Sequence, residues 1–219
     1  MKNKTLIVWD WNGTLVNDSF LFVSIMNVFL KEQGLEKLTI QKYRSLFDFP
    51  IKNYYLNLGF DFNKESFESL GKRFIDEYKQ RWREPSLFFG IKKLLCFLNK
   101  KGCLQFVVSA QENLLLKKAI KHYDLDSFFV DFVGVPNFFA KGKELVAKRL
   151  LSSYLKEDYR VFVIGDTLYD LRVANALGAC PVLVSFGHNS KEKLKEKNVL
   201  IVDSVKDLYA YFSNLDGLC

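Results

Sequence analysis

Apolar residues follow two patterns along this chain, and each pattern predicts a different kind of element. Short, mostly apolar runs predict strands that are buried on both faces. They span residues 6–9, 104–108, 128–135, 160–164, 182–184 and 200–202. Apolar stripes at helical spacing predict helices between these strands, over residues 90–101, 112–123, 142–155, 168–177 and 205–212. This alternation predicts an α/β fold: a Rossmann-like, doubly wound parallel sheet with helices on both faces.

Residues 20 to 85 break this alternation, because only helical spacing occurs there. The stripes predict helices over residues 20–33, 39–47, 50–58 and 64–82. A purely helical segment between the first and second strands indicates an inserted subdomain, with links near residues 16–19 and 83–87. We therefore expect residues 1–16 and 86–219 to form the Rossmann-like core, and residues 17–85 to form a helical cap on it.

Composition narrows the class of protein. A chain of 219 residues with 49% apolar and 26% charged residues is long and apolar enough for one folded domain with an insertion. The net charge of +7 is spread thinly and no basic-aromatic stripe occurs, so we expect no nucleic-acid partner. The apolar run at 20–30 is too short to cross a membrane. The four cysteines lack metal or redox spacing, which favours free thiols in the cytoplasm. Nothing indicates the oligomeric state.

Polar side chains follow three of the predicted strands, at the point where each strand ends. They are Asp10 and Asn12, then Ser109, then Asp166 and Asp170. Adjacent strand ends of a doubly wound sheet meet at one crevice, where carboxylates repel one another unless a cation lies between them. An all-oxygen set favours Mg²⁺, which also takes phosphate oxygens. Ser109, a lysine at 141 or 143, and free backbone N–H groups at 11–13 and after Ser109 would complete an anion site.

Four segments of the chain resemble, in order, the motifs of the haloacid dehalogenase-like hydrolases. Asp10-Trp-Asn-Gly-Thr-Leu15 is similar to the first motif, usually Asp-x-Asp-Gly-Thr-Leu, and Val107-Val-Ser109-Ala110 to the second. Lys143 resembles the lysine of the third motif, with Lys141 as the alternative, and Gly165-Asp166-Thr-Leu-Tyr-Asp170 resembles the fourth. The helical insertion is similar in place and size to the cap of the phosphoglycolate phosphatase-like branch.

The resemblance implies a Mg²⁺-dependent phosphatase that acts on a small phosphorylated metabolite. Asp10 would attack phosphorus and form an aspartyl-phosphate, and Asp170 would orient Lys143 or the metal's waters. Asp10, the backbone carbonyl of Asn12 and Asp166 would hold Mg²⁺. The residues implied in substrate binding are Trp11, Gly13, Thr14, Ser109, Ala110, Lys143 and, from the cap, Lys52.

Position 12 departs from the family's pattern, since the usual acid–base aspartate is Asn12. An amide does not exchange protons at neutral pH, so protonation of the leaving group is open. A good leaving group or another acid would resolve it. So would C–P bond hydrolysis, as in phosphonoacetaldehyde hydrolases, with Lys52 forming a Schiff base. The remaining alternative is a phosphate-binding protein with weakened catalysis. Other candidates are Arg44, Tyr54 and Tyr55 for the leaving group and His188 for the rim of the site, each of which packing explains equally well or better.

Overall fold

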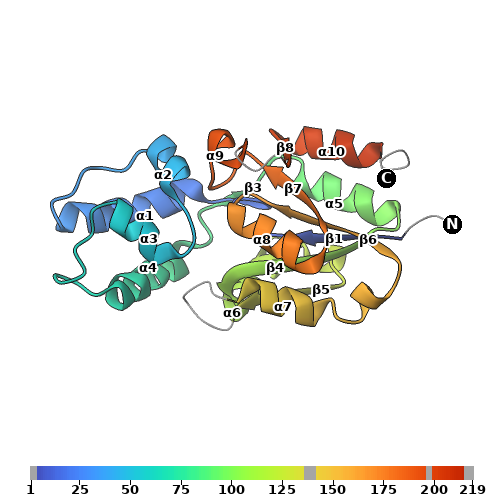
Figure 1. The fold of residues 1–219 in the computed structure, drawn as a ribbon, viewed down its shortest axis with the longest axis horizontal. Coiled ribbons are helices and arrows are strands. Elements are labelled where there is room, and N and C mark those ends of the chain that lie inside the picture. Colours follow the sequence, from blue (N-terminus) through green and yellow to red (C-terminus); the bar gives the residue numbers. More distant parts are fainter. Residues whose placement is uncertain (1–3, 136–141, 196–198, 215–219) are drawn as a thin grey trace.

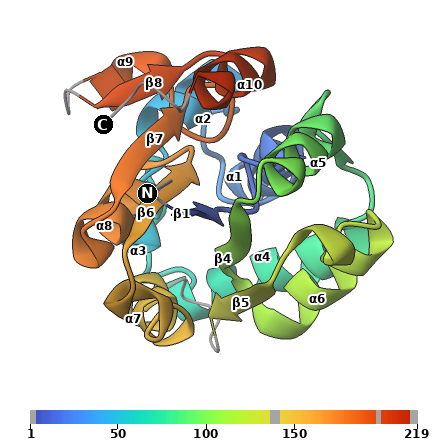
Figure 2. The same ribbon diagram turned by 90° about the vertical axis from the view of Figure 1, so that its right-hand side faces the viewer.

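The computed structural model describes residues 4–135, 142–195 and 199–214, and within them the chain folds around a six-stranded parallel sheet. The strand order is β5-β4-β1-β6-β7-β8 (Figures 1 and 2). The strands are β1 (Lys4–Trp9), β4 (Leu104–Glu112), β5 (Asp131–Val135), β6 (Tyr159–Gly165), β7 (Cys180–Val184) and β8 (Leu200–Val202). The fold class predicted from the sequence is confirmed.

Strand β1 lies in the middle of the sheet because its side chains are apolar on both faces. It pairs in parallel with β4 and β6, so that Trp9 is level with Val107 and Ile164. Ile7 and Trp9 point toward one core, while Leu6 and Val8 point toward another. Because β1 has a paired strand on each side and a packed core on each face, it is a fully buried central strand. Asp10, the residue that follows β1, is therefore held at the carboxyl edge of the sheet.

Helices cover both faces of the sheet. The first face carries α5 (Ile91–Lys100), α6 (Asn113–His122) and α10 (Val205–Ser213), and the second carries α7 (Lys143–Leu150) and α8 (Leu168–Leu177). Three short helical segments complete this part of the chain: η1 (Asp126–Phe128), η2 (Tyr154–Lys156) and α9 (Lys191–Lys195). The helix expected over 142–155 therefore ends five residues early and is followed by a short 3-10 turn.

Four helices gather at one end of the molecule, beyond the carboxyl edge of the sheet (Figure 1). They are α1 (Ser19–Glu32), α2 (Ile40–Leu46), α3 (Ile51–Asn57) and α4 (Phe67–Arg81). The two links that join them to the sheet pair with each other as short antiparallel strands, β2 (Val16–Asn17) and β3 (Ser86–Leu87). This pairing was not predicted, and it brings both links together at one point.

The loop after β7 holds these helices against the sheet. Asn189 donates from Nδ2 to the carbonyl of Phe47 at 2.7 Å, and Lys193 donates to the same carbonyl at 2.7 Å. The guanidinium of Arg44 donates to the carbonyl of Ser185. Helix α2 and Phe47 are therefore in direct contact with the loop after β7 and with α9.

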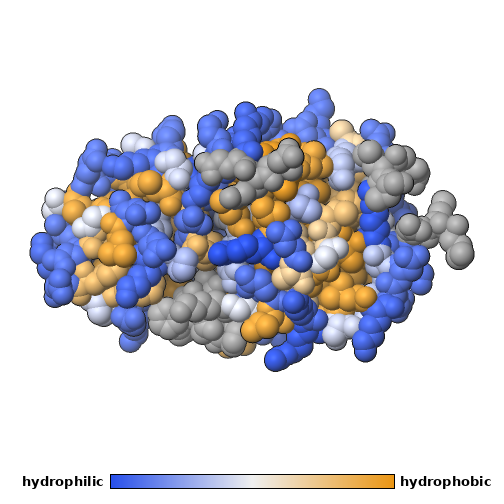
Figure 3. Space-filling model, in the orientation of Figure 1, coloured by the Kyte–Doolittle hydropathy of each residue, from blue (hydrophilic) through white to orange (hydrophobic). Residues whose placement is uncertain are grey.

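Strand β4 is longer than expected, since it continues through Glu112 rather than ending before Ser109. Its register against β5 shifts between Ser109 and Glu112, which places a bulge at the predicted strand end. Hydrophilic side chains are dispersed over the face of the molecule in Figure 3, as the evenly spread charge predicts. Within the described residues, no helix has the length and hydropathy needed to span a membrane.

Candidate active site

Three carboxylates and one lysine meet at the carboxyl edge of the sheet. The ammonium of Lys143, at the start of α7, lies 2.6 Å from Oδ1 of Asp10 and 2.5 Å from Oδ1 of Asp170. Asp170 also accepts hydrogen bonds from the backbone N–H (3.0 Å) and hydroxyl (2.7 Å) of Thr167, which starts α8. Asp170 is thereby fixed in position, and it orients the lysine toward Asp10.

The three carboxylates could hold a metal ion. Asp10, Asp166 and Asp170 each offer an oxygen, and these oxygens lie within 4.8 Å of one another. Burial raises the pKa of Asp10 well above its usual range, against the opposing charge of Lys143, and the nearby carboxylates raise it further. Burial also raises the pKa of Asp166. One lysine does not balance three buried acids, so this oxygen-only set fits a hard divalent cation.

Burial and charge act in opposite directions on Lys143. Burial alone would lower the pKa of its ammonium, but the carboxylates of Asp10 and Asp170 outweigh that effect and raise it. Lys143 therefore stays cationic in the site, where it can bind an anion as well as its two partners.

Asp166 is held by the turn that follows β1. The hydroxyl of Thr14 donates to Oδ1 of Asp166 at 2.9 Å, and the backbone N–H of His188 donates to Oδ2 at 2.5 Å. Gly13 has a φ of +74°, and an added Cβ would collide with the Asp166 carboxylate and the His188 ring. Thr14 thus orients the Asp166 carboxylate, and Gly13 leaves room for it. The sequence predicted that both residues bind the substrate.

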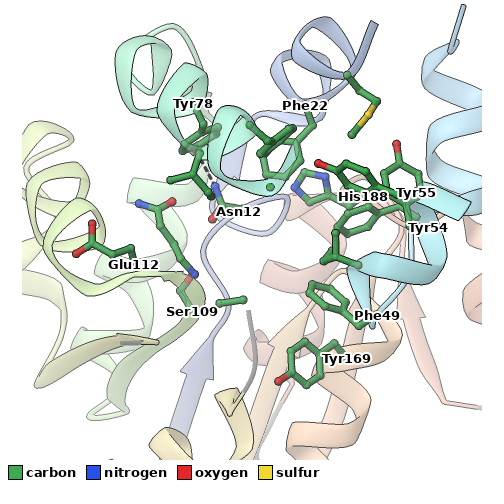
Figure 4. A pocket seen from close by; sticks show the side chains of 18 of the residues that line it. Asn12, Phe22, Phe49, Tyr54, Tyr55, Tyr78, Ser109, Glu112, Tyr169 and His188 are labelled. Atoms are coloured by element: carbon green, nitrogen blue, oxygen red, sulfur yellow. Dashed lines mark hydrogen bonds between the residues drawn. The ribbon is translucent and has the colours of Figure 1, made fainter. Parts of the chain in front are cut away.

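Asn12 belongs to a buried polar network that the sequence did not reveal. Its Nδ2 donates to Oδ2 of Asp18 at 2.5 Å. It also donates to the hydroxyl of Tyr78 at 2.7 Å (Figure 4). The Tyr78 hydroxyl donates to the same Asp18 oxygen at 3.0 Å. The backbone N–H of Gly13 donates to the other Asp18 oxygen at 3.0 Å. Both N–H bonds of the Asn12 amide are therefore directed at protein acceptors.

His188 joins this network to helix α2. Its Nε2 lies 3.2 Å from Oδ1 of Asp18, and its Nδ1 lies 2.6 Å from the hydroxyl of Tyr43. Burial alone would lower the pKa of the imidazole, but the Asp18 carboxylate raises it, and the balance is upward. His188 lines the pocket and is buried, which places it deeper than the rim position that the sequence offered as one possibility.

Three residues of this network were absent from the sequence-based prediction: Asp18, Tyr43 and Tyr78. The sequence signal at Asp18 points to a different role, because an aspartate directly before a helix is a preferred N-cap residue. Here Asp18 precedes α1 but makes no side-chain cap hydrogen bond, and its carboxylate faces the site instead. Tyr43 and Tyr78 lie on apolar helix stripes, where spacing alone does not separate a core residue from a site residue.

The remaining predicted site residues are placed as follows. A pocket lies between the carboxylate cluster and the helical segment, and Ser109 and Ala110 belong to its wall. The Ser109 hydroxyl accepts a hydrogen bond from the backbone N–H of Gln111 at 3.0 Å. The side chain of Trp11 is buried, with its ring 6.0 Å from that of Tyr123. Lys52 is exposed, its ammonium 5.6 Å from the Phe62 ring, and it does not line the pocket. Lys141 lies outside the described residues.

Comparison with known proteins identifies the family. Residues 7–184 match the model of the haloacid dehalogenase-like hydrolase family. A phosphoglycolate phosphatase of Caulobacter vibrioides is 25% identical over 197 residues, which cover 86% of this chain and 82% of that protein. A 5'-nucleotidase of Pseudomonas aeruginosa is 22% identical over 196 residues, 86% of each chain. The crystal structure of a predicted phosphatase from Clostridium acetobutylicum has the same fold, with a TM-score of 0.79 and 22% identity over 97% of this chain and 99% of that one.

Proposed function

Because the chain belongs to the haloacid dehalogenase-like hydrolase family, we propose that it is a Mg²⁺-dependent phosphatase acting on a small phosphorylated metabolite through Asp10. The arrangement of Asp10, Lys143, Asp166 and Asp170 at one sheet edge is the observation that carries this proposal. The named phosphatase and nucleotidase relatives support it.

Each residue of the cluster has a defined task in this reaction. The Asp10 carboxylate attacks phosphorus, and an aspartyl-phosphate forms as the ester oxygen leaves. Lys143 and the Ser109 hydroxyl bind the phosphoryl oxygens, and Asp170 holds Lys143 in place. Phosphoryl transfer depends mainly on positioning and on cations near the oxygens, which matches a rigid, buried cluster.

Mg²⁺ would be held by Asp10, Asp166 and the backbone carbonyl of Asn12, which is available whatever the side chain is. When bound, Mg²⁺ offsets the negative charge of the carboxylates and of the phosphoryl group. Thr14 and the His188 backbone keep the Asp166 carboxylate oriented for this role.

The helical segment serves as the cap in this proposal. We assign residues 17–85 to the cap, and residues 1–16 and 86–219 to the core, because the paired links β2 and β3 mark both crossings between them. The cap covers the cluster, and it excludes water and contacts the leaving group. Lys52 is exposed and lies outside the pocket lining, so we do not propose C–P hydrolysis through a Schiff base at this residue.

The test is turnover of p-nitrophenyl phosphate by the wild type, Asp10→Asn and Asp158→Asn, each with Mg²⁺ and with EDTA. Asp158 is an exposed aspartate that precedes β6, at the opposite end of the strand that leads to Asp166. We expect Mg²⁺-dependent release that falls by about 10³-fold or more in Asp10→Asn and is unchanged in Asp158→Asn. Metal or phosphate binding without turnover would instead identify a phosphate-binding protein, in keeping with the amide at position 12.

A further inference from the structure

A cavity of about 420 Å³ lies between the catalytic cluster and the cap. Asp10, Ser109 and Lys143 line one end of it. Phe and Tyr make up ten of the 25 other lining residues. Figure 4 shows the rings of Phe22, Phe49 and Tyr54 across the cavity from Ser109. The aromatic residues that matter here are Phe22, Phe47, Phe49, Tyr54, Phe74 and Tyr78. The volume is sufficient for a phosphate group together with a ring of moderate size.

The charged side chains of the cap do not make the interior of this cavity polar. Glu68, Lys72 and Asp76 of α4 belong to the lining but are exposed to solvent. Lys79 and Glu112 lie 3.7 Å apart as an ion pair, so their charges offset each other. A charged or polyhydroxylated leaving group would lose its hydration against aromatic rings without gaining ionic partners. A flat aromatic leaving group would instead find the stacking and edge contacts that rings provide.

Two residues of the cavity wall, Tyr54 and Gln111, carry neutral polar groups. The hydroxyl of Tyr54, a residue only 2% exposed, has no hydrogen-bond partner among the described residues, and neither has the side-chain amide of Gln111. Burial raises the pKa of Tyr54 well above its usual range, so the hydroxyl stays protonated. The polar groups that these two residues add to the wall are therefore uncharged, which suits an uncharged leaving group.

The hydrogen bonds of Asn12 limit the chemistry at the other end of the cavity. Both of its N–H bonds are taken by Asp18 and Tyr78, and the Tyr78 hydroxyl is itself directed at Asp18. Position 12 therefore has no proton to give to the leaving oxygen. An alkoxide leaves poorly without that proton, whereas a phenolate, whose acid has a pKa of about 10, leaves readily.

We propose that the substrate is a phosphate monoester whose ester oxygen is attached directly to an aromatic or heteroaromatic ring, which the cap holds in the aromatic cavity. This inference names the substrate class of the proposed phosphatase and rests on that function. A carboxylate oxygen of Asp10 bonds to phosphorus as the bond between phosphorus and the ester oxygen breaks. The electron pair of that bond leaves with the ester oxygen, which stays on the ring and takes a proton from water. Water then bonds to phosphorus, the bond to Asp10 breaks, and phosphate and a carboxylate result.

Three substrates distinguish the effect of an aromatic ring from the effect of a good leaving group. Phenyl phosphate has the ring and a phenolic oxygen, benzyl phosphate has the ring and an alcohol oxygen, and acetyl phosphate has a good leaving group without a ring. We expect kcat/KM for phenyl phosphate to exceed that for benzyl phosphate by about 100-fold or more, as is typical when a general acid is missing. Asn12→Asp should narrow this gap by raising turnover of benzyl phosphate.

A variant pair tests the cavity. Phe49→Leu should raise KM for phenyl phosphate, relative to KM for acetyl phosphate, by about fivefold or more, because it removes a ring from the wall. Phe97→Leu, which removes a ring on α5 outside this cavity, should leave that ratio unchanged.

The outcomes distinguish the two proposals. Turnover of acetyl phosphate with equal kcat/KM for phenyl and benzyl phosphate, or with no effect of Phe49→Leu on the KM ratio, would overturn the aryl substrate class and leave the phosphatase standing. No turnover of any of the three would overturn the phosphatase, and the aryl substrate with it.

Discussion

At the scale of single residues, Asp18 changes what Asn12 can do. A carboxylate buried beside position 12 is satisfied by an amide, which donates to it. An aspartate at position 12 would place two carboxylates together, and one of them would have to keep its proton. The amide therefore stabilises the network around Asp18 and removes the acid from the reaction, which links the stability of the site to the choice of leaving group.

Among the described glycines with a positive φ, Gly13 alone has atoms within 3.0 Å of an added Cβ. We expect Gly13→Ala to lose about 1–3 kcal/mol of unfolding free energy from the positive φ alone, and more from the collision with Asp166 and His188. The matched control is Gly34→Ala, because Gly34 has a φ of +71° but nothing within 4 Å of an added Cβ. Thermal unfolding should show a larger loss of stability in Gly13→Ala than in Gly34→Ala. Turnover of p-nitrophenyl phosphate should fall in Gly13→Ala alone. Equal effects of both variants on the two measurements would show that the collision is unimportant.

At the scale of elements, we infer that the contact between α2 and the loop after β7 holds the proposed cap in place. Tyr43, Arg44 and Phe47, all on α2 or at its end, contact this loop. The same loop supplies the backbone N–H that orients Asp166. One short segment therefore connects the position of the cap to the geometry of the carboxylate cluster.

Asn189 is the test of that connection, because it donates to the carbonyl of Phe47 and accepts from the N–H of Leu168. We expect Asn189→Ala to lower the unfolding free energy by about 1–3 kcal/mol, since buried backbone groups lose their partner. Hydrogen exchange should become faster in α2 and stay unchanged elsewhere in the cap. Asn53→Ala, an exposed change on α3, should stay within about 0.5 kcal/mol of the wild type. Unchanged exchange in α2 would show that this loop does not hold the cap.

At the scale of the whole molecule, the buried carboxylates couple folding to protons and to metal. The pKa values of Asp10 and Asp166 are raised by burial, so the folded protein holds their protons more tightly than the unfolded chain. That contribution favours folding below the ordinary aspartate pKa of about 3.9, and it is lost as pH rises through the higher folded values. A divalent cation would replace the protons as the balancing charge.

We therefore expect Mg²⁺ to raise the melting temperature, and the rise to grow with pH from the ordinary aspartate range toward neutrality. A concentration of 100 times Kd adds about 2.7 kcal/mol. Asp166→Asn should reduce the Mg²⁺-induced rise at every pH, whereas Asp158→Asn should keep it. Scanning calorimetry with Mg²⁺ and with EDTA at several pH values provides the measurement. A rise that is equal in wild type and Asp166→Asn, or that shrinks with pH, would place the metal elsewhere.

The sequence by itself determined the sheet, its helices and the carboxylate cluster. Continuous apolar runs specify strands buried on both faces, and parallel strands bring their carboxyl ends to one edge, so Asp10 and Asp166 had to meet there. These are properties of residue order and chain direction, and each can be read from a short window of the chain.

Only the tertiary structure decided the surroundings of that cluster. Asp18 and Tyr78 lie 60 residues apart in the chain, and Tyr43 and His188 lie 145 apart, yet each pair is in hydrogen-bonding contact. Such contacts depend on how the cap packs on the core, and periodicity does not report the direction in which an aromatic side chain on an apolar stripe points. The sequence alone showed that position 12 lacks an acid. The aromatic residues on which the proposed aryl leaving group rests were brought together only by the packing of the cap on the core.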